Sequence, residues 1–130
     1  MNTFPECLVG MQLVKWYEGC NTLVLRDANQ QKYMLWFDDT HHGDCCGYNE
    51  VSAELYISDE DLLANPIITR VEQVKDGTGC IDEVELIFFG GSRKLMRVSS
   101  TSGSESGYEY GACVTVRCKD LKIEAVLTQW

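Results

Sequence analysis

The sequence has no long apolar run and no recognisable secretion signal. No stretch approaches the roughly 18 consecutive apolar residues that a membrane-spanning helix needs. Residues 1–19 lack the basic segment followed by an uninterrupted apolar segment that marks a signal peptide. These two absences predict a soluble protein of the cytoplasm that does not associate with membranes.

Positive charge is also scarce. Eleven lysines and arginines stand against 20 aspartates and glutamates, which gives a net charge of −9. Such a chain repels nucleic acid at long range and attracts basic protein surfaces. We therefore expect no direct nucleic-acid binding, and we expect a protein partner with a basic surface, such as an effector that itself binds nucleic acid. Acidity that serves only solubility is the ordinary alternative.

Phosphate-binding and catalytic motifs are missing as well. The chain has no GxxxxGK[ST] or GxGxxG loop and no recognisable Ser-His-Asp arrangement. Seven cysteines without a secretion signal favour reduced thiols over a disulfide framework, and several are expected to pack as small hydrophobic residues. The sequence therefore predicts a protein that is not an enzyme and has no resident cofactor, with zinc as the one metal to be considered.

What the sequence does contain is a series of short β-type segments. Its 130 residues are a usual length for one domain, and no repeat, linker or composition shift divides residues 1–130. Alternating or wholly apolar runs between turn residues predict a mainly β, α+β fold of about eight or nine antiparallel strands, with a hairpin turn at Gly90-Gly91. So many strands in one flat sheet would leave long exposed edges, so we expect a barrel or a sandwich.

One short helix is expected at residues 59–64. Ser58 can cap its N-terminus, and Asn65-Pro66 ends it. Three acidic residues occupy the first turn: Asp59, Glu60 and Asp61. Capping and the helix dipole explain these residues without any catalytic role.

The stretch HHGDCCGYNE, residues 41–50, holds both histidines of the chain. Side chains that can ligate zinc in this stretch are those of His41, His42, Asp44, Cys45 and Cys46, and the two histidines and two cysteines are the expected ligands. Their spacing is poor for one ion, because adjacent cysteines diverge in a strand, so zinc would need a turn here and a further ligand such as Cys113 or Cys118. Two other interpretations stay open: a histidine-activated thiol, which the nearby carboxylates oppose, and a plain turn capped by Asp44.

A second unusual stretch, SGSESGYEYGACV, combines glycines with two tyrosines. Tyr108 and Tyr110 are two positions apart and would share one face of a strand, where they can bind a ligand or partner or form an aromatic ladder. Further aromatic residues that are available for a pocket or an interface are Trp16, Tyr17, Trp36, Phe37 and Tyr48. If this stretch meets the Asp44-Cys45-Cys46 turn at one end of the fold, together they would form a binding site.

Three segments of the chain resemble an uncharacterised family of small phage and bacterial proteins. That family carries an H-x-x-D-C-C motif, a D-L-[IL]-G-x-P-I segment and an S-N-G-Y-Y-S motif. The matching residues are His41, Asp44, Cys45 and Cys46, then Asp61, Leu62, Leu63, Pro66 and Ile67, then Ser106, Gly107, Tyr108 and Tyr110. The chain departs from the pattern at Ala64-Asn65, where the family has glycine, lacks the asparagine of the third motif, and has Glu109 between its tyrosines. The resemblance, over residues 8–118, implies an origin in a phage or mobile element and no established enzymatic role.

Two functions are expected from these features. The first is a small acidic, non-enzymatic binding protein that inhibits a host defence component, as an anti-CRISPR does, by covering its surface in the host cytoplasm. The carboxylates expected to contribute are Asp59, Glu60, Asp61, Asp82, Glu83 and Glu85. The alternative is a domain that binds a nucleotide-like ligand or a metal ion through Asp44, Cys45, Cys46, Tyr108 and Tyr110. A final strand with an exposed edge, ending in Trp130, can also pair with its copy in a homodimer.

Overall fold

The computed structural model describes residues 3–42, 46–77, 79, 81–104 and 111–130. Within these residues it contains nine strands, one short α-helix and two short 3-10 turns. The strands are β1 Gln12–Tyr17, β2 Thr22–Arg26, β3 Lys32–His41, β4 Gly47–Leu55, β5 Arg70–Lys75, β6 Ile81–Gly90, β7 Arg93–Ser104, β8 Cys113–Cys118 and β9 Ile123–Gln129. The helix is α1 Asp59–Leu63, and the 3-10 turns are η1 Glu6–Leu8 and η2 Glu18–Cys20.

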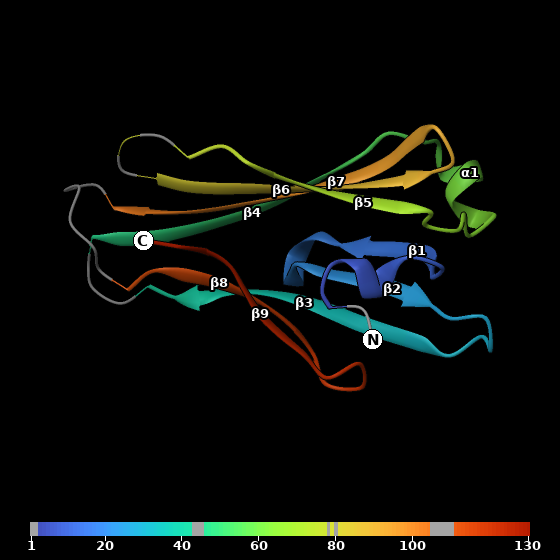
Figure 1. The fold of residues 1–130 in the computed structure, drawn as a ribbon, viewed down its shortest axis with the longest axis horizontal. Helices are drawn as coiled ribbons and strands as arrows, with labels where there is room; N and C mark the ends of the chain where they lie inside the picture. Colours follow the sequence, from blue (N-terminus) through green and yellow to red (C-terminus); the bar gives the residue numbers. More distant parts are fainter. Residues whose placement is uncertain (1–2, 43–45, 78, 80, 105–110) are drawn as a thin grey trace.

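The strands form two antiparallel sheets that face each other (Figure 1). The five-stranded sheet has the order β1-β2-β3-β8-β9, and the four-stranded sheet has the order β4-β7-β6-β5. The predicted mainly β fold with about nine strands is therefore confirmed. Neither sheet closes on itself, so the barrel alternative was wrong and the arrangement is sandwich-like. Closure was not needed because the apolar face of each sheet is covered by the other sheet.

Alternation along the strands separates the core from the outer faces. On β6, Val84, Leu86 and Phe88 are buried between the sheets, whereas Glu83 and Glu85 face outward. Burial of such side chains contributes about 1.5–3 kcal/mol each, which fixes the register because a slip of one residue would exchange the two faces. The largest fully buried side chains of the shared core include Phe37, Phe88, Leu8, Leu13, Leu23 and Leu25.

The hairpin between β6 and β7 forms at the predicted glycines. Gly90 pairs with Arg93, which leaves Gly91 and Ser92 as the turn. Gly91 has a φ of 66°, a conformation that glycine adopts without a steric penalty. Local turn chemistry was therefore sufficient to place this hairpin.

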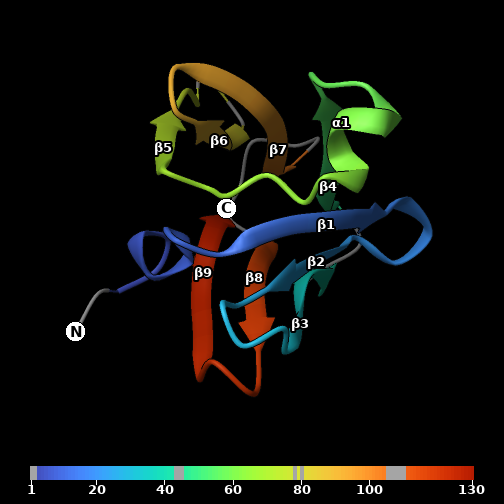
Figure 2. The same ribbon diagram turned by 90° about the vertical axis from the view of Figure 1, so that its right-hand side faces the viewer.

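The helix begins where the sequence predicts and ends one residue earlier. The Ser58 hydroxyl accepts a hydrogen bond from the Asp61 N–H at 3.1 Å, which is the predicted N-cap. Figure 2 shows α1 above β1 and next to β4, at the end of the molecule that faces the viewer. In the described part of the chain, no helix is long and apolar enough to cross a membrane.

The interior becomes polar toward the other end of the molecule. The inward-facing residues of β7 are apolar as far as Val98, and three buried serines follow, Ser100, Ser102 and Ser104. The hydroxyl of Thr128 on β9 lies 2.8 Å from both the Ser100 and the Ser102 hydroxyl oxygens. Because β7 and β9 belong to different sheets, these hydrogen bonds join the two layers.

Asn49 on β4 extends this hydroxyl network. Its side-chain carbonyl accepts a hydrogen bond from the Ser102 hydroxyl at 2.8 Å. Its amide nitrogen donates to the backbone carbonyls of Asp39 and His41, at 3.1 and 2.6 Å. Buried polar groups are costly unless they are paired, so this chain of hydrogen bonds is what makes a polar interior tolerable here.

Candidate functional site

The two motif segments of the sequence are flanked by strand ends that lie side by side. Asp44 and Cys45 lie outside the described residues, and so do Tyr108 and Tyr110. Two strand pairings surround these segments: His41 at the end of β3 pairs with Cys113 at the start of β8, and Gly47 at the start of β4 pairs with Ser104 at the end of β7. Figure 1 shows these strand ends at the end of the molecule opposite α1. A shared site built from the two segments stays a prediction.

Metal binding by His41, His42, Cys45 and Cys46 also stays a prediction. Among the residues that the structure describes, no group of three His, Cys, Asp or Glu side chains is placed to hold a metal ion. Cys113 is partly buried beside His41. Cys118, the other suggested ligand, is in the hydrophobic core at the far end of β8, about 17 Å away at the usual rise per strand residue. Cys118 is therefore unsuitable as a ligand for this site.

The six predicted binding carboxylates lie in three different places. Asp59, Glu60 and Asp61 are on α1, where Asp61 pairs with Arg93 at 2.8 Å. Asp82 is opposite the inward-facing Ser102 and accepts a hydrogen bond from the Gln129 N–H at 2.9 Å, so it ties β6 to β9. Only two of the six, Glu83 and Glu85, face outward from the four-stranded sheet.

Two further glutamates join Glu83 and Glu85 on that outer surface. The pairings place Glu50 opposite Thr101 and Thr101 opposite Glu83, so that these three residues form one row across β4, β7 and β6. The neighbouring rows add Ser52, Ser99 and Glu85, and then Glu54 and Arg97. We call the surface formed by Glu50, Glu54, Glu83, Glu85 and Arg97 the acidic face. The alternation of VSAELYIS indicated that Glu54 faces outward, but the strands beside it could not be read from the sequence.

Charge on the acidic face is only partly compensated. Arg97 bridges Glu54 and Glu85, with nitrogen–oxygen distances of 2.9 and 3.0 Å. Glu50 and Glu83 make no ion pair with any of the described residues. Between them stands Thr101, with Glu50 exposed and Glu83 partly exposed.

The outer surface of the five-stranded sheet has the opposite character. One row across this sheet contains Tyr17, Thr22, Trp36, Arg117 and Glu124. Tyr17 and Trp36 are 44% and 40% exposed, which is high for aromatic side chains on a sheet. The other basic residues of this surface are Lys15, Arg26 and Lys32. We call it the basic aromatic face, and it lies on the other side of the molecule from the acidic face.

Asp38 and Arg117 connect β3 to β8 on the basic aromatic face. The Asp38 carboxylate is 3% exposed and accepts hydrogen bonds from the Thr40 hydroxyl at 2.6 Å, the Thr40 N–H at 3.0 Å and Arg117 Nε at 3.0 Å. Burial by itself raises the pKa of Asp38, but these hydrogen bonds outweigh it and hold the pKa below its usual value. Arg117 also pairs with Glu124, and the two carboxylates raise its pKa.

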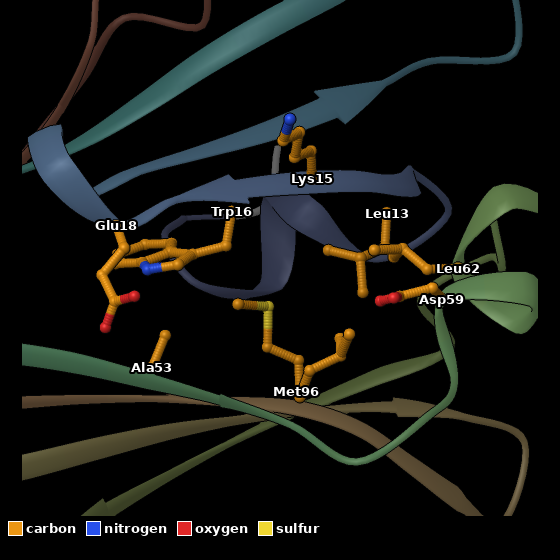
Figure 3. Close-up of a pocket in the computed structure, with 9 residues that line it drawn as sticks. Leu13, Lys15, Trp16, Glu18, Ala53, Asp59, Leu62 and Met96 are labelled. Carbon is orange, nitrogen blue, oxygen red and sulfur yellow. The ribbon is translucent and has the colours of Figure 1, made fainter.

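A pocket of about 260 Å³ opens between β1 and β4, beside α1 (Figure 3). Leu13 and Met96 are buried and form its inner wall, and Trp16 closes one side. The Trp16 indole nitrogen is shielded from solvent and has no hydrogen-bond partner in the described residues. The other lining residues are Lys15, Glu18, Ala53, Leu55, Asp59 and Leu62.

Trp16 is the one pocket residue among the described aromatic residues that the sequence had singled out. Its ring packs edge-on against Phe37, with ring centres 5.7 Å apart. The other aromatic residues of that set lie elsewhere: Phe37 is in the core, Tyr17 and Trp36 are on the basic aromatic face, and Tyr48 is on the outer side of β4. The sequence identified these aromatic residues but did not show which of them are buried, which are exposed and which line the pocket.

The predicted homodimer has one structural requirement in place. β9 is an edge strand of the five-stranded sheet, and Val126 on it is 56% exposed. Dimer formation through this edge stays a prediction.

Comparison with known proteins adds no further constraint on function: no protein-family model, no curated protein and no solved structure matches the chain.

Proposed function

We propose that this chain is a non-enzymatic binding protein that covers a basic surface of a protein partner with its acidic face. The observation that carries the proposal is the pair Glu50 and Glu83, which flank Thr101 in one cross-strand row and have no ion-pair partner among the residues that the structure describes. With strands about 4.8 Å apart, the two residues stand about 10 Å apart across β7. Lysine or arginine side chains of a partner would supply the compensating charge.

The geometry supports a protein partner more than nucleic acid. Phosphates would meet repulsion from the acidic face and from the net charge of −9. A protein that itself binds nucleic acid offers a complementary groove lined with lysine and arginine. Together with the resemblance to phage proteins, this favours a host defence effector as the target, inhibited by occlusion of its nucleic-acid groove.

The test is affinity capture with the tagged full chain as bait. Partners are captured from a lysate of the cells in which the chain occurs. The double variant Glu50→Gln/Glu83→Gln removes two charges from the acidic face, and Asp59→Asn/Glu60→Gln removes two from α1. Both variants change the net charge equally, so bulk charge cannot account for a difference between them. We expect the partner to be lost from the first variant and retained by the second.

Salt gives a second readout of the same contact. At physiological ionic strength, salt screens the attraction between surface charges over a distance of about 8 Å, and a higher salt concentration shortens this distance. Capture should therefore fall between 0.15 and about 0.6 M salt. Equal loss of the partner from both double variants, or capture that is indifferent to salt, would contradict the proposal.

A second candidate function is a ligand or metal site at the end opposite α1. It is favoured by the pairings of His41 with Cys113 and of Gly47 with Ser104, which bring the strand ends beside the two motif segments together. Metal analysis of protein purified under reducing conditions tests it, with Cys46→Ser as the comparison. Stoichiometric zinc that is lost in Cys46→Ser would favour this function over the first.

A further inference from the structure

We propose that the pocket between β1 and β4 binds a small, neutral, planar heteroaromatic molecule. The pocket is formed by β1, β4, β7 and α1, and none of its lining residues belongs to the acidic face. The inference therefore goes beyond the proposed function and does not depend on it.

The size of the pocket sets the size of the ligand. The pocket opens to solvent and has a volume of about 260 Å³. An apolar cavity of about 150 Å³ accepts a single benzene ring, and sites for drug-sized molecules begin at about 300 Å³. The pocket lies between these limits, and a bicyclic aromatic ring system suits it.

The wall chemistry requires a mainly apolar ligand. Leu13, Leu62 and Met96 present aliphatic carbon and sulfur to the cavity (Figure 3). A thioether makes favourable contacts with the edges of aromatic rings, and the Trp16 ring offers a stacking surface on the adjacent wall. Each of these contacts favours a flat aromatic ring over a flexible or charged ligand.

The Trp16 indole nitrogen requires a hydrogen-bond acceptor on that ligand. A buried donor without a partner costs about 1–3 kcal/mol, and the Trp16 N–H is in this condition. An acceptor such as a ring nitrogen would remove the cost on binding, which is the reason for a heteroaromatic ring rather than a hydrocarbon.

The rim of the pocket disfavours a negatively charged ligand. It carries two carboxylates, Glu18 and Asp59, whereas the Lys15 ammonium points away from the cavity and lies 4.7 Å from the centre of the Tyr17 ring (Figure 3). An anion would meet repulsion from the two carboxylates. The apolar walls leave any charge on the ligand without a partner, so a neutral ligand fits best.

Quinoline and naphthalene form a matched pair of probes for this site. The two molecules share size and shape, but only quinoline has a ring nitrogen that can accept the Trp16 N–H. Nuclear magnetic resonance of the full chain labelled with nitrogen-15 reports the indole N–H signals of Trp16, Trp36 and Trp130 separately, and the Trp16→Phe variant assigns the first. We expect quinoline to move the Trp16 signal downfield in a saturable way and naphthalene to bind at least about tenfold more weakly.

Two variants confine the effect to the pocket. Ala53→Leu adds a branched side chain to the wall and should weaken quinoline binding by about tenfold or more, whereas Val126→Leu on β9 should leave it unchanged. If Ala53→Leu loses the dispersed backbone spectrum, Ala53→Val makes the same test with one carbon less.

Three outcomes would overturn the inference. These are a Trp16 signal that does not move at the solubility limit of quinoline, equal affinity for the two probes, and unchanged quinoline binding in the folded Ala53 variant. The Glu50→Gln/Glu83→Gln variant should bind quinoline normally, so failure here is distinguishable from failure of the proposed function.

Discussion

At the scale of single residues, Asp38 shows how a buried charge is held in this fold. Its pKa lies below the ordinary value because the hydrogen bonds from Thr40 and Arg117 outweigh the effect of burial. A carboxyl whose pKa is lowered on folding stabilises the native state fully above its unfolded pKa of about 3.9, and this contribution is lost as the pH falls through the lower folded pKa.

Asp38→Asn should lower the free energy of unfolding by about 1–3 kcal/mol at pH 6, because it removes the charge from buried charge-assisted hydrogen bonds. The difference between the variant and the natural protein should begin to shrink below about pH 4, where Asp38 of the unfolded chain takes up a proton, and should be lost once the pH falls below the lowered folded pKa. Urea unfolding monitored by fluorescence at pH 6 and pH 3 measures both values.

Glu124→Gln is the matched control, because Glu124 binds the same Arg117 but is 73% exposed. Surface ion pairs contribute about 0–1 kcal/mol, so this variant should be little changed. An effect of Glu124→Gln equal to that of Asp38→Asn would show that burial does not set the strength of these contacts.

Asp38 and Trp16 show which contacts could not be predicted from the sequence. The nearness of Asp38 to Thr40 is local and readable, but Arg117 comes from 79 positions further along the chain. Trp16 could be named as an available aromatic residue, yet the unpartnered state of its indole nitrogen depends on how α1, β4 and β7 pack around it. Individual side chains were predictable where their partners are near in sequence.

At the scale of secondary-structure elements, local sequence patterns were enough to predict which elements form but not which strands pair with each other. Alternation predicted the strands, Ser58 predicted the start of α1, and Gly90-Gly91 predicted the hairpin. The pairings of β3 with β8 and of β4 with β7 join segments far apart in the chain, and no local pattern encodes them. The acidic face depends on the second of these pairings, which is why Glu50 was missed.

The hydroxyl network between β7 and β9 leads to a prediction for that pair of elements. Thr128→Val keeps the shape of the side chain but leaves the Ser100 and Ser102 hydroxyls without this partner. It should lower the free energy of unfolding by about 1–3 kcal/mol, although valine is the more hydrophobic residue. Urea unfolding measures it, with the outward-facing Thr101→Val expected within about 0.5 kcal/mol of the natural protein.

A double-mutant cycle separates the network from the single side chains. Removing both partners of a buried hydrogen bond costs less than the sum of the single removals, because no unsatisfied group is left. Ser100→Ala combined with Thr128→Val should therefore be less destabilised than the sum, by about 0.5 kcal/mol or more. Strict additivity would mean that the two hydroxyls do not act together.

At the scale of the whole molecule, charge is divided between the two sheets. The acidic face has Glu50 and Glu83 without ion-pair partners among the described residues, and the basic aromatic face on the other side has Lys15, Arg26 and Lys32. A net charge alone could not predict this separation, because it follows from which strands share a sheet. It gives the molecule one surface suited to a basic partner.

Carboxylate footprinting of the isolated complex tests that central claim most directly. Carbodiimide labelling followed by mass spectrometry reports how accessible each carboxylate is in the free chain and in the complex with its captured partner. We predict that Glu50 and Glu83 lose labelling in the complex while Asp59 and Glu60 keep it. Unchanged labelling of Glu50 and Glu83, with protection at Asp59 and Glu60 instead, would contradict binding through the acidic face.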